Sequence, residues 1–316
     1  MRKWLSLALR AVLVAGCAAY VAWDLDWAAF GNALLRYDPM LLAAALAMTF
    51  PPYVVQGYRL RYLTRHAATF SNCFAAALFC LGVNNILPAK LGEVAKAFYL
   101  RHTAGIPLGQ GLGMVFWERF FDLNTLLLFG MCSAWGMGYT IAVAPLGAVV
   151  GGIWACLVMF RLFPATAAAM ERLIPGERLR LLFREVMTQV RESSGWGFFV
   201  VLGLYSVVFW AANVLFIYAA VQWVGGAPLT MAQAVTVLVM SGVGMAVPSS
   251  PGSLGVFEAA VLLSLSWFGI PKAEALGIGL VLRVLTFTPT TLAALVIMAR
   301  SGLSLKGIRA SDPETL

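Results

Sequence analysis

A block of sequence occurs twice in the chain, and it constrains the fold more than any other feature. The first copy runs from Pro88-Ala-Lys-Leu-Gly-Glu93 through Gly105-Ile-Pro107 to Arg119. The second copy runs from Pro251-Gly-Ser-Leu-Gly-Val-Phe-Glu258 through Gly269-Ile-Pro271 to Arg283. In both copies the arginine follows the second proline by twelve residues. Each copy therefore predicts a break, a short helix, a second break and a long apolar helix that contains one arginine.

Composition places the chain among integral membrane proteins. Hydrophobic residues make up 61% of the 316 positions and charged residues only 11%, which is too little polar surface for a soluble globule. The net charge of +8 comes from basic segments between apolar runs, as orientation in a membrane requires, so no nucleic-acid partner is expected. The five cysteines lie in apolar runs without a CxxC pair or a suitably spaced histidine. We therefore expect no metal and no other cofactor.

Apolar runs and basic segments together predict the topology. The run from Trp4 to Trp23 has about the twenty residues needed to cross ~30 Å of hydrocarbon. A second run, from Met40 to Tyr58, is followed at once by a cluster of arginines, which is typical of a cytoplasmic loop. The arginine-rich segment from Arg172 to Glu192 belongs on the same side. We therefore predict that both termini are cytoplasmic and that residues 24–38 and the Gly269-Ile-Pro271 turn lie outside.

The arginine cluster after Tyr58, the segment from Arg172 to Glu192 and the carboxyl terminus can all be cytoplasmic only if two segments enter the membrane and return on the same side. These segments are residues 70–104 and 229–268. The predicted fold class is an all-α polytopic membrane protein with about six full transmembrane helices and two re-entrant helical hairpins in an inverted repeat. Residues 1–139 form the first half of a single membrane domain and residues 140–300 the second half, followed by a short tail, 301–316. Full crossing by residues 70–87 and 229–247 stays open as an alternative.

Ionisable residues inside apolar helices are candidate functional residues. Twelve residues at 1.5 Å per residue place Arg119 and Arg283 about 18 Å into their helices, near the bilayer centre. Glu118 and Asp122 on the same helix supply Arg119 with a partial counter-charge. Arg283 has no carboxylate three or four residues away, and Glu258 reaches it only if the second hairpin folds against the last span. We therefore expect Arg119 to be mainly structural and Arg283 to be available to a ligand.

The hairpin tips are a second candidate element. Ser250 is a predicted N-cap with Pro251 at the first helical position, and the neighbouring glycines allow close backbone approach. A helix that begins there directs N–H groups and a positive dipole end into the membrane interior, which suits a phosphate or carboxylate. Alternatively, the glycines serve helix packing and the charges form salt bridges within the fold. The predicted substrate-binding residues are Lys90, Gly92, Glu93, Glu118, Arg119, Asp122, Ser250, Gly252, Ser253, Gly255, Glu258 and Arg283, and none is predicted to be catalytic or to bind metal.

These motifs resemble the transmembrane region of lysylphosphatidylglycerol synthases, a flippase-like family. Leu91-Gly-Glu93, Glu118-Arg119 with Asp122, and Pro251 to Glu258 carry the resemblance, which covers roughly residues 5 to 300. The resemblance implies movement of a lipid between leaflets. Members of the family occur alone or fused to a soluble aminoacyl transferase domain. Because only seventeen residues follow Ala299, we do not expect the synthase activity.

Three functions remain open at this point. A flippase or translocase for an anionic or phosphate-bearing lipid, either a phospholipid or a polyprenyl phosphate, is favoured because arginines and helix N-termini suit a compact anion. A membrane-embedded glycosyl or acyl transferase is the alternative, with Glu93, Glu118 and Asp122 as acid or base. A non-catalytic subunit of a lipid- or glycan-modifying system is the third. We expect no enzymatic activity, a lipid headgroup as partner and a multi-pass location in the cell (inner or plasma) membrane.

Overall fold

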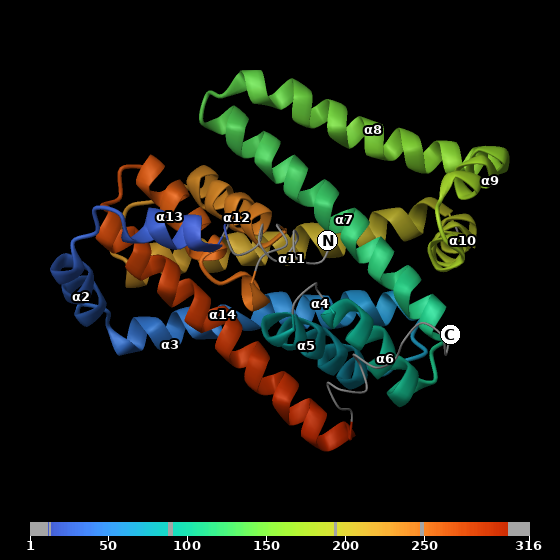
Figure 1. Ribbon diagram of the computed structural model, residues 1–316, viewed down its shortest axis with the longest axis horizontal. Helices are drawn as coiled ribbons and strands as arrows, with labels where there is room; N and C mark the ends of the chain where they lie inside the picture. Colours follow the sequence, from blue (N-terminus) through green and yellow to red (C-terminus); the bar gives the residue numbers. More distant parts are fainter. Residues whose placement is uncertain (1–11, 13, 88–90, 193–194, 247–249, 303–316) are drawn as a thin grey trace. The chain divides into compact units, whose positions relative to one another are not determined.

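The computed structural model of the chain is built from helices (Figure 1), and the part of the chain that it describes contains no strand. The structure describes residues 12, 14–87, 91–192, 195–246 and 250–302. Residues 4–11 and 13 of the predicted first span, the candidate residue Lys90 and the tail from residue 303 therefore lie outside the described residues. Within the predicted first span, residues 14–22 are helical. The predicted all-α class is confirmed for the described residues.

The helices follow the apolar runs of the sequence closely. Four segments are long and apolar enough to cross a membrane among the described residues, namely Pro39–Leu63, Thr140–Leu162, Gly195–Val224 and Lys272–Ser301. The helices are α2 (Trp27–Leu35), α3 (Pro39–Ala47), α4 (Phe50–Leu63), α5 (Phe70–Ile86), α6 (Gly92–Ala104), α7 (Leu108–Gly136), α8 (Val143–Leu162), α9 (Pro164–Leu173), α10 (Glu177–Glu192), α11 (Gly195–Ala219), α12 (Met231–Ala246), α13 (Val256–Trp267) and α14 (Lys272–Ser301), with short helical turns η2 (Thr140–Ala142), η3 (Ala220–Val224) and η4 (Pro251–Ser253).

Each predicted hairpin consists of two short helices separated by a break. Helix α5 has 17 residues and ends at Ile86, and α6 begins at Gly92 with 13 residues. Helix α12 has 16 residues and packs against α13, which has 12. All four are shorter than the roughly 20 residues that a full crossing needs. The breaks lie where the sequence predicts them, while the re-entrant topology and the count of six spans remain predictions.

Two segments that the sequence analysis interpreted as connectors contain helices. Helix α2 lies in the acidic connector, and the Asp26 side chain caps it by accepting a hydrogen bond from the Ala29 N–H at 2.9 Å. Helix α10 lies in the arginine-rich segment and packs against α7 and α8. Neither helix was predicted, because neither segment has the run of about twenty apolar residues that marks a membrane span. The N-cap aspartate and the polar, amphipathic pattern of α10 are the signals that predict such helices.

The chain folds into two compact units, each of which draws on both halves of the sequence. Unit 1 comprises Met1–Tyr53, Leu78–Gly92 and Ala211–Val296, and unit 2 comprises Val54–Ala77, Glu93–Trp210 and Ile297–Leu316. The two units are described separately below.

Small residues bring the helices of unit 1 close together. A Cβ atom added at Gly82 of α5 would lie under 3.0 Å from the backbone of α14 at Thr290. A Cβ atom added at Gly92 would lie 2.6 Å from the side-chain oxygen of Asn84. Close approach of helix backbones through glycine is a common packing mode inside membranes. This finding supports the packing interpretation for at least these glycines.

The two helix breaks also meet inside unit 1. A Cβ atom added at Gly252, in the second break, would lie 3.1 Å from the carbonyl oxygen of Asn85, at the end of α5. The Asn85 side chain in turn donates to the Phe287 carbonyl at 3.3 Å and to the hydroxyls of Thr290 and Thr291 at 3.0 Å each. Both breaks are therefore fixed against the middle of α14.

An aromatic cluster forms the core of unit 2. Trp117, Phe120 and Phe121 on α7 make mainly edge-to-face contacts with Trp154 on α8 and with two phenylalanines of α11. Trp117 is 1% exposed. Because this cluster occupies one face of α7, the charged residues of α7 are directed to another face, toward α4 and α6.

Candidate functional site

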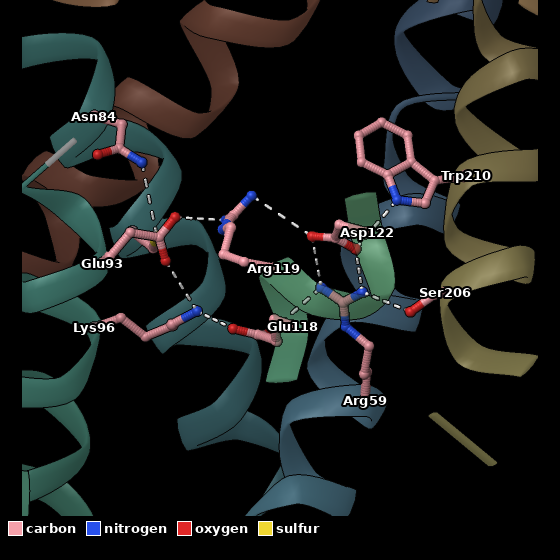
Figure 2. Close-up of polar contacts among 10 residues, drawn as sticks. Arg59, Asn84, Glu93, Lys96, Glu118, Arg119, Asp122, Ser206 and Trp210 are labelled. Carbon is pink, nitrogen blue, oxygen red and sulfur yellow. Dashed lines mark hydrogen bonds and ion pairs between the residues drawn. The ribbon is translucent and has the colours of Figure 1, made fainter. Parts of the chain in front are cut away.

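Six ionised side chains of unit 2 form a closed ring in which positive and negative charges alternate (Figure 2). One comes from α4, two from α6 and three from α7. Three cations and three carboxylates give the ring a formal charge of zero. In order around the ring, the members of this charge ring are Arg59, Asp122, Arg119, Glu93, Lys96 and Glu118, which returns to Arg59.

The contacts of the ring differ in length. Arg59 Nη1 lies 2.6 Å from Asp122 Oδ1, and Arg59 Nη2 lies 3.6 Å from Glu118 Oε1. Lys96 forms a close ion pair with Glu118 and a second, at 3.4 Å, with Glu93 Oε2. Arg119 lies 2.5 Å from Glu93 Oε1 and 3.5 Å from Asp122 Oδ2. Every charge therefore has two neighbours of opposite sign, as a buried ionic cluster requires.

Burial varies around the ring and leaves one corner open. The side chains of Arg59, Lys96 and Glu118 are at most 1% exposed, and that of Asp122 is 7% exposed. Glu93 is 14% exposed and Arg119 is 48% exposed. Water or a ligand can therefore reach the ring at Arg119, with Glu93 beside it, while the opposite side is sealed.

Asp122 is the most firmly held carboxylate of the ring. Arg59 donates to both of its oxygens, at 2.6 and 3.5 Å, and Trp210 of α11 donates its indole N–H at 3.1 Å (Figure 2). Arg59 is itself fixed by a 3.1 Å hydrogen bond to Ser206 and lies over the Phe209 ring at 5.2 Å. Together these contacts fix Asp122 with respect to α4 and α11.

Four of the ring residues were predicted from the sequence, and two were missed. Glu93, Glu118, Arg119 and Asp122 are brought together as candidate site residues. Arg59 was interpreted as part of a cytoplasmic loop, but it lies inside α4 and is fully buried, 0% exposed. Lys96 was not among the predicted site residues. Three carboxylates beside a single arginine require further cations inside the membrane, and that charge balance is the signal that could have identified both residues.

Arg283 in unit 1 is held by an arrangement that we call the Arg283 clamp. Glu258 of α13 pairs with the guanidinium through both carboxylate oxygens, and its Oε2 accepts from Nη2 at 2.9 Å. The guanidinium also donates to the carbonyls of Gly252 at 2.9 Å and Ser253 at 3.1 Å. The Arg283 side chain is 9% exposed. The rings of Phe287 and Phe257 lie 4.4 and 5.0 Å from its guanidinium carbon, which completes the clamp.

The clamp reverses the expected roles of the two arginines. The second hairpin does fold against the last span, so Glu258 reaches Arg283 and neutralises it. The half-exposed arginine is Arg119, which the sequence analysis expected to be mainly structural. The expectation was wrong because the sequence alone does not show which helices pack together. The partner of Arg283 comes from α13, and the nearest partner of Arg119 comes from α6.

The predicted helix start at Pro251 also needs correction. Only the single turn η4 forms there, because Gly252 and Ser253 have φ angles of +63° and +53°, outside the helical region. Helix α13 begins at Val256 instead. The Ser250 hydroxyl donates to the Leu254 carbonyl at 2.9 Å and caps no helix.

The chain's own side chains accept the N–H groups at both helix starts. The Gly255 N–H donates to Glu258 Oε2 at 2.8 Å, and the Gly92 N–H donates to Asn84 Oδ1 at 2.8 Å. The described residues contain no group of three or more histidines, cysteines or carboxylates that could hold a metal ion.

Comparison with known proteins agrees with these features. A family model described as the lysylphosphatidylglycerol synthase TM region matches residues 7–294. A UPF0104 membrane protein of Methanothermobacter thermautotrophicus is 24% identical over 278 residues, which cover 82% of this chain and 83% of that protein. The matched region contains all the candidate spans except the last few residues of α14. This multi-pass integral membrane protein therefore belongs to the family of lysylphosphatidylglycerol synthase transmembrane regions.

Proposed function

We propose that this protein moves a lipid with an anionic, phosphate-bearing headgroup between the leaflets of the cell membrane. The observation that carries the proposal is the half-exposed guanidinium of Arg119 in the middle of the long helix α7. The family to which the chain belongs is named after a lipid-modifying synthase, and this name supports a role that involves lipids.

The position of Arg119 argues for a polar pathway. Helix α7 has 29 residues and is about 43 Å long, so Arg119, twelve residues from its start, lies near mid-membrane if α7 crosses. An exposed guanidinium is costly in hydrocarbon and is tolerated where it faces water or a polar ligand. An arginine also binds phosphate with two parallel hydrogen bonds. These properties favour a lipid phosphate as the group that passes Arg119.

The pairing of the carboxylates favours transport over transferase chemistry. Glu93, Glu118 and Asp122 each lie between two cations of the charge ring. A general acid or base must exchange a proton with the substrate, whereas each of these carboxylates is paired with two cations of the chain. We therefore assign the carboxylates as counter-charges that shape a binding site.

The breaks in the helices support a transporter architecture. Inverted repeats with broken helices that meet near the midplane are typical of secondary transporters. In unit 1 the break after α5 and the break before α13 meet at Asn85 and Gly252. We propose that these short helices form the two re-entrant hairpins and that six further helices cross the membrane, with both termini in the cytoplasm.

A vesicle assay tests the proposed function. The purified full-length protein is placed in liposomes with a fluorescent phosphatidylglycerol, and a membrane-impermeant reductant reports how much of the dye has reached the inner leaflet. We expect movement of this lipid and no chemical modification of it, and we expect Arg119→Gln to abolish the movement. Arg184→Gln is the matched control, because Arg184 forms a similar 2.5 Å pair with Glu171 but lies outside the ring.

Other outcomes of this assay assign the remaining functions. Chemical modification of the lipid would establish a transferase, and neither movement nor modification would favour a subunit of a larger system. Equal movement of a neutral glycolipid and its phosphorylated analogue would exclude the proposed headgroup chemistry. Orientation is tested separately by a cysteine placed at position 180 in α10, which an impermeant reagent added to intact cells should fail to reach.

A further inference from the structure

We infer, building on the proposed function, that Glu93 is an exchangeable occupant of the anion site at Arg119. Its carboxylate pairs with the guanidinium when no lipid is bound, and a phosphate diester headgroup takes its place during transport. The observation behind this inference is the difference between the two carboxylates that flank Arg119 in the charge ring.

Asp122 is held by partners other than Arg119 on two sides, whereas Glu93 lies at the open corner of the ring. Arg59 and the indole N–H of Trp210 hold Asp122 on two sides, independently of Arg119. Asp122 is also the more distant partner of Arg119, at 3.5 Å against 2.5 Å for Glu93. Glu93 is the more exposed of the two carboxylates, 14% against 7%. A ligand that approaches the open corner of the ring therefore meets Arg119 and Glu93 together.

Glu93 has a second cation that keeps its charge balanced after it releases Arg119. Its Oε2 lies 3.4 Å from Lys96, while its Oε1 is the atom that contacts Arg119. A small rotation of the side chain toward Lys96 therefore gives up one ion pair and keeps the other. Without this neighbour, release would leave a poorly compensated carboxylate in the membrane, at a large cost in free energy.

Electrostatic repulsion makes exchange more favourable than simple addition. A phosphate that joined Arg119 while Glu93 stayed in place would bring two anions to one guanidinium, and like charges at such separations repel. Replacement keeps one close anion on Arg119 before and after binding. A phosphate diester has one negative charge and two terminal oxygens, which match the charge of the departing carboxylate and the bidentate geometry of the guanidinium.

Titration of lipid into the detergent-solubilised full-length protein tests the inference. The probe is short-chain phosphatidylglycerol, with glycerophosphoglycerol, the same diester headgroup, as an arm without acyl chains and a neutral galactolipid as an arm without phosphate. Because Glu93→Gln removes the competing charge, we expect phosphatidylglycerol to bind about two- to fivefold more tightly than to the wild type, as for an ion pair of this exposure. A similar gain for glycerophosphoglycerol would show that the headgroup alone exchanges with Glu93. A gain confined to phosphatidylglycerol would show that the lipid is the ligand, and the galactolipid should show none.

Matched variants make the test decisive. Glu171→Gln removes a carboxylate from a comparable Glu–Arg pair outside the ring and should leave the affinity unchanged. If Glu93→Gln does not fold, Glu93→Asp takes its place in the titration. This variant keeps the charge on a shorter side chain, which withdraws from Arg119. Unchanged or weaker phosphatidylglycerol binding in the folded Glu93 variant, or an equal gain in Glu171→Gln, would overturn the inference.

The two proposals fail in different ways. Tighter binding by Glu93→Gln without lipid movement in wild-type vesicles would refute transport and leave the exchange at Arg119 intact. Lipid movement that depends on Arg119, with no gain in affinity in Glu93→Gln, would leave transport intact and refute the exchange.

Discussion

Replacing each of the two repeat arginines by glutamine should affect stability very differently. Arg283→Gln removes the cation of the Arg283 clamp and leaves Glu258, which is 13% exposed, without its bidentate partner. The same change frees the carbonyls of Gly252 and Ser253, which the guanidinium holds at 2.9 and 3.1 Å. We therefore expect Arg283→Gln to unfold the second break and to destabilise the whole protein.

The magnitudes follow from the two environments. Removing one partner of a buried ion pair costs about 3–5 kcal/mol. Arg119 is 48% exposed, and after its removal Glu93 still has Lys96 while Asp122 still has Arg59, so its loss should cost about 0.2–1 kcal/mol. The difference in the free energy of unfolding between the two variants should therefore be about 2–5 kcal/mol.

Thermal unfolding in detergent measures this difference directly. Arg119→Gln should melt close to the wild type and lose lipid movement, whereas Arg283→Gln should melt well below both. Changing Glu258 to Gln as well should restore part of the loss, because no uncompensated charge remains and the amide oxygen can still accept from the Gly255 N–H. If Arg119→Gln melts as low as Arg283→Gln, the assignment of Arg119 as the open corner of the ring is refuted.

Three further predictions concern other parts of the fold. Gly92→Ala should destabilise by about 1–3 kcal/mol, because its Cβ would collide with the backbone carbonyl oxygen of Cys80 and lie 2.6 Å from the Asn84 side-chain oxygen. Gly203→Ala, whose nearest neighbour lies at 3.7 Å, should change the melting temperature little. Trp210→Phe removes the indole hydrogen bond to the ring and should cost about 1 kcal/mol in unfolding experiments while leaving the other ring contacts in place. The hydrogen bond from Arg184 holds the pKa of Glu171 below its ordinary value. At a pH above that ordinary pKa, the pair should therefore help to hold α9 against α10. This contribution should be lost as the pH falls through the lowered pKa. Hydrogen exchange of these two helices against pH, in the wild type and in Glu171→Gln, checks this sign.

The helical scaffold was largely predictable because the bilayer imposes a simple rule. Apolar runs of about twenty residues must form helices, and prolines and glycines mark the places where helices break. The predicted second run, Met40 to Tyr58, accordingly lies within the helical segment Pro39–Leu63. The helix before Pro39 followed no such rule, since α2 is short and depends on the cap provided by Asp26.

The candidate site was only partly predictable because it is assembled from residues far apart in the sequence. Spacing along one helix identified Glu118, Arg119 and Asp122 as neighbours, and the structure confirms that they share one cluster. No local rule connects Arg59 to Asp122, which lies 63 residues away, and a hydropathy count places this arginine at the end of its span. Charge balance across all the apolar segments is the criterion that connects them.

The two repeat arginines differ in exposure and in ion pairing because of one position in the sequence. In both copies a carboxylate from the helix after the break reaches the arginine of the following long helix, as Glu93 reaches Arg119 and Glu258 reaches Arg283. Lys96 lies three residues after Glu93, whereas the residue three positions after Glu258 is Val261. With no lysine to compete, Glu258 gives both oxygens to Arg283 and closes the clamp. Lys96 instead takes one oxygen of Glu93, so Arg119 receives only the other and stays half-exposed. The lysine therefore makes the first copy of the block suitable for exchanging an anion, while the second copy holds the fold together.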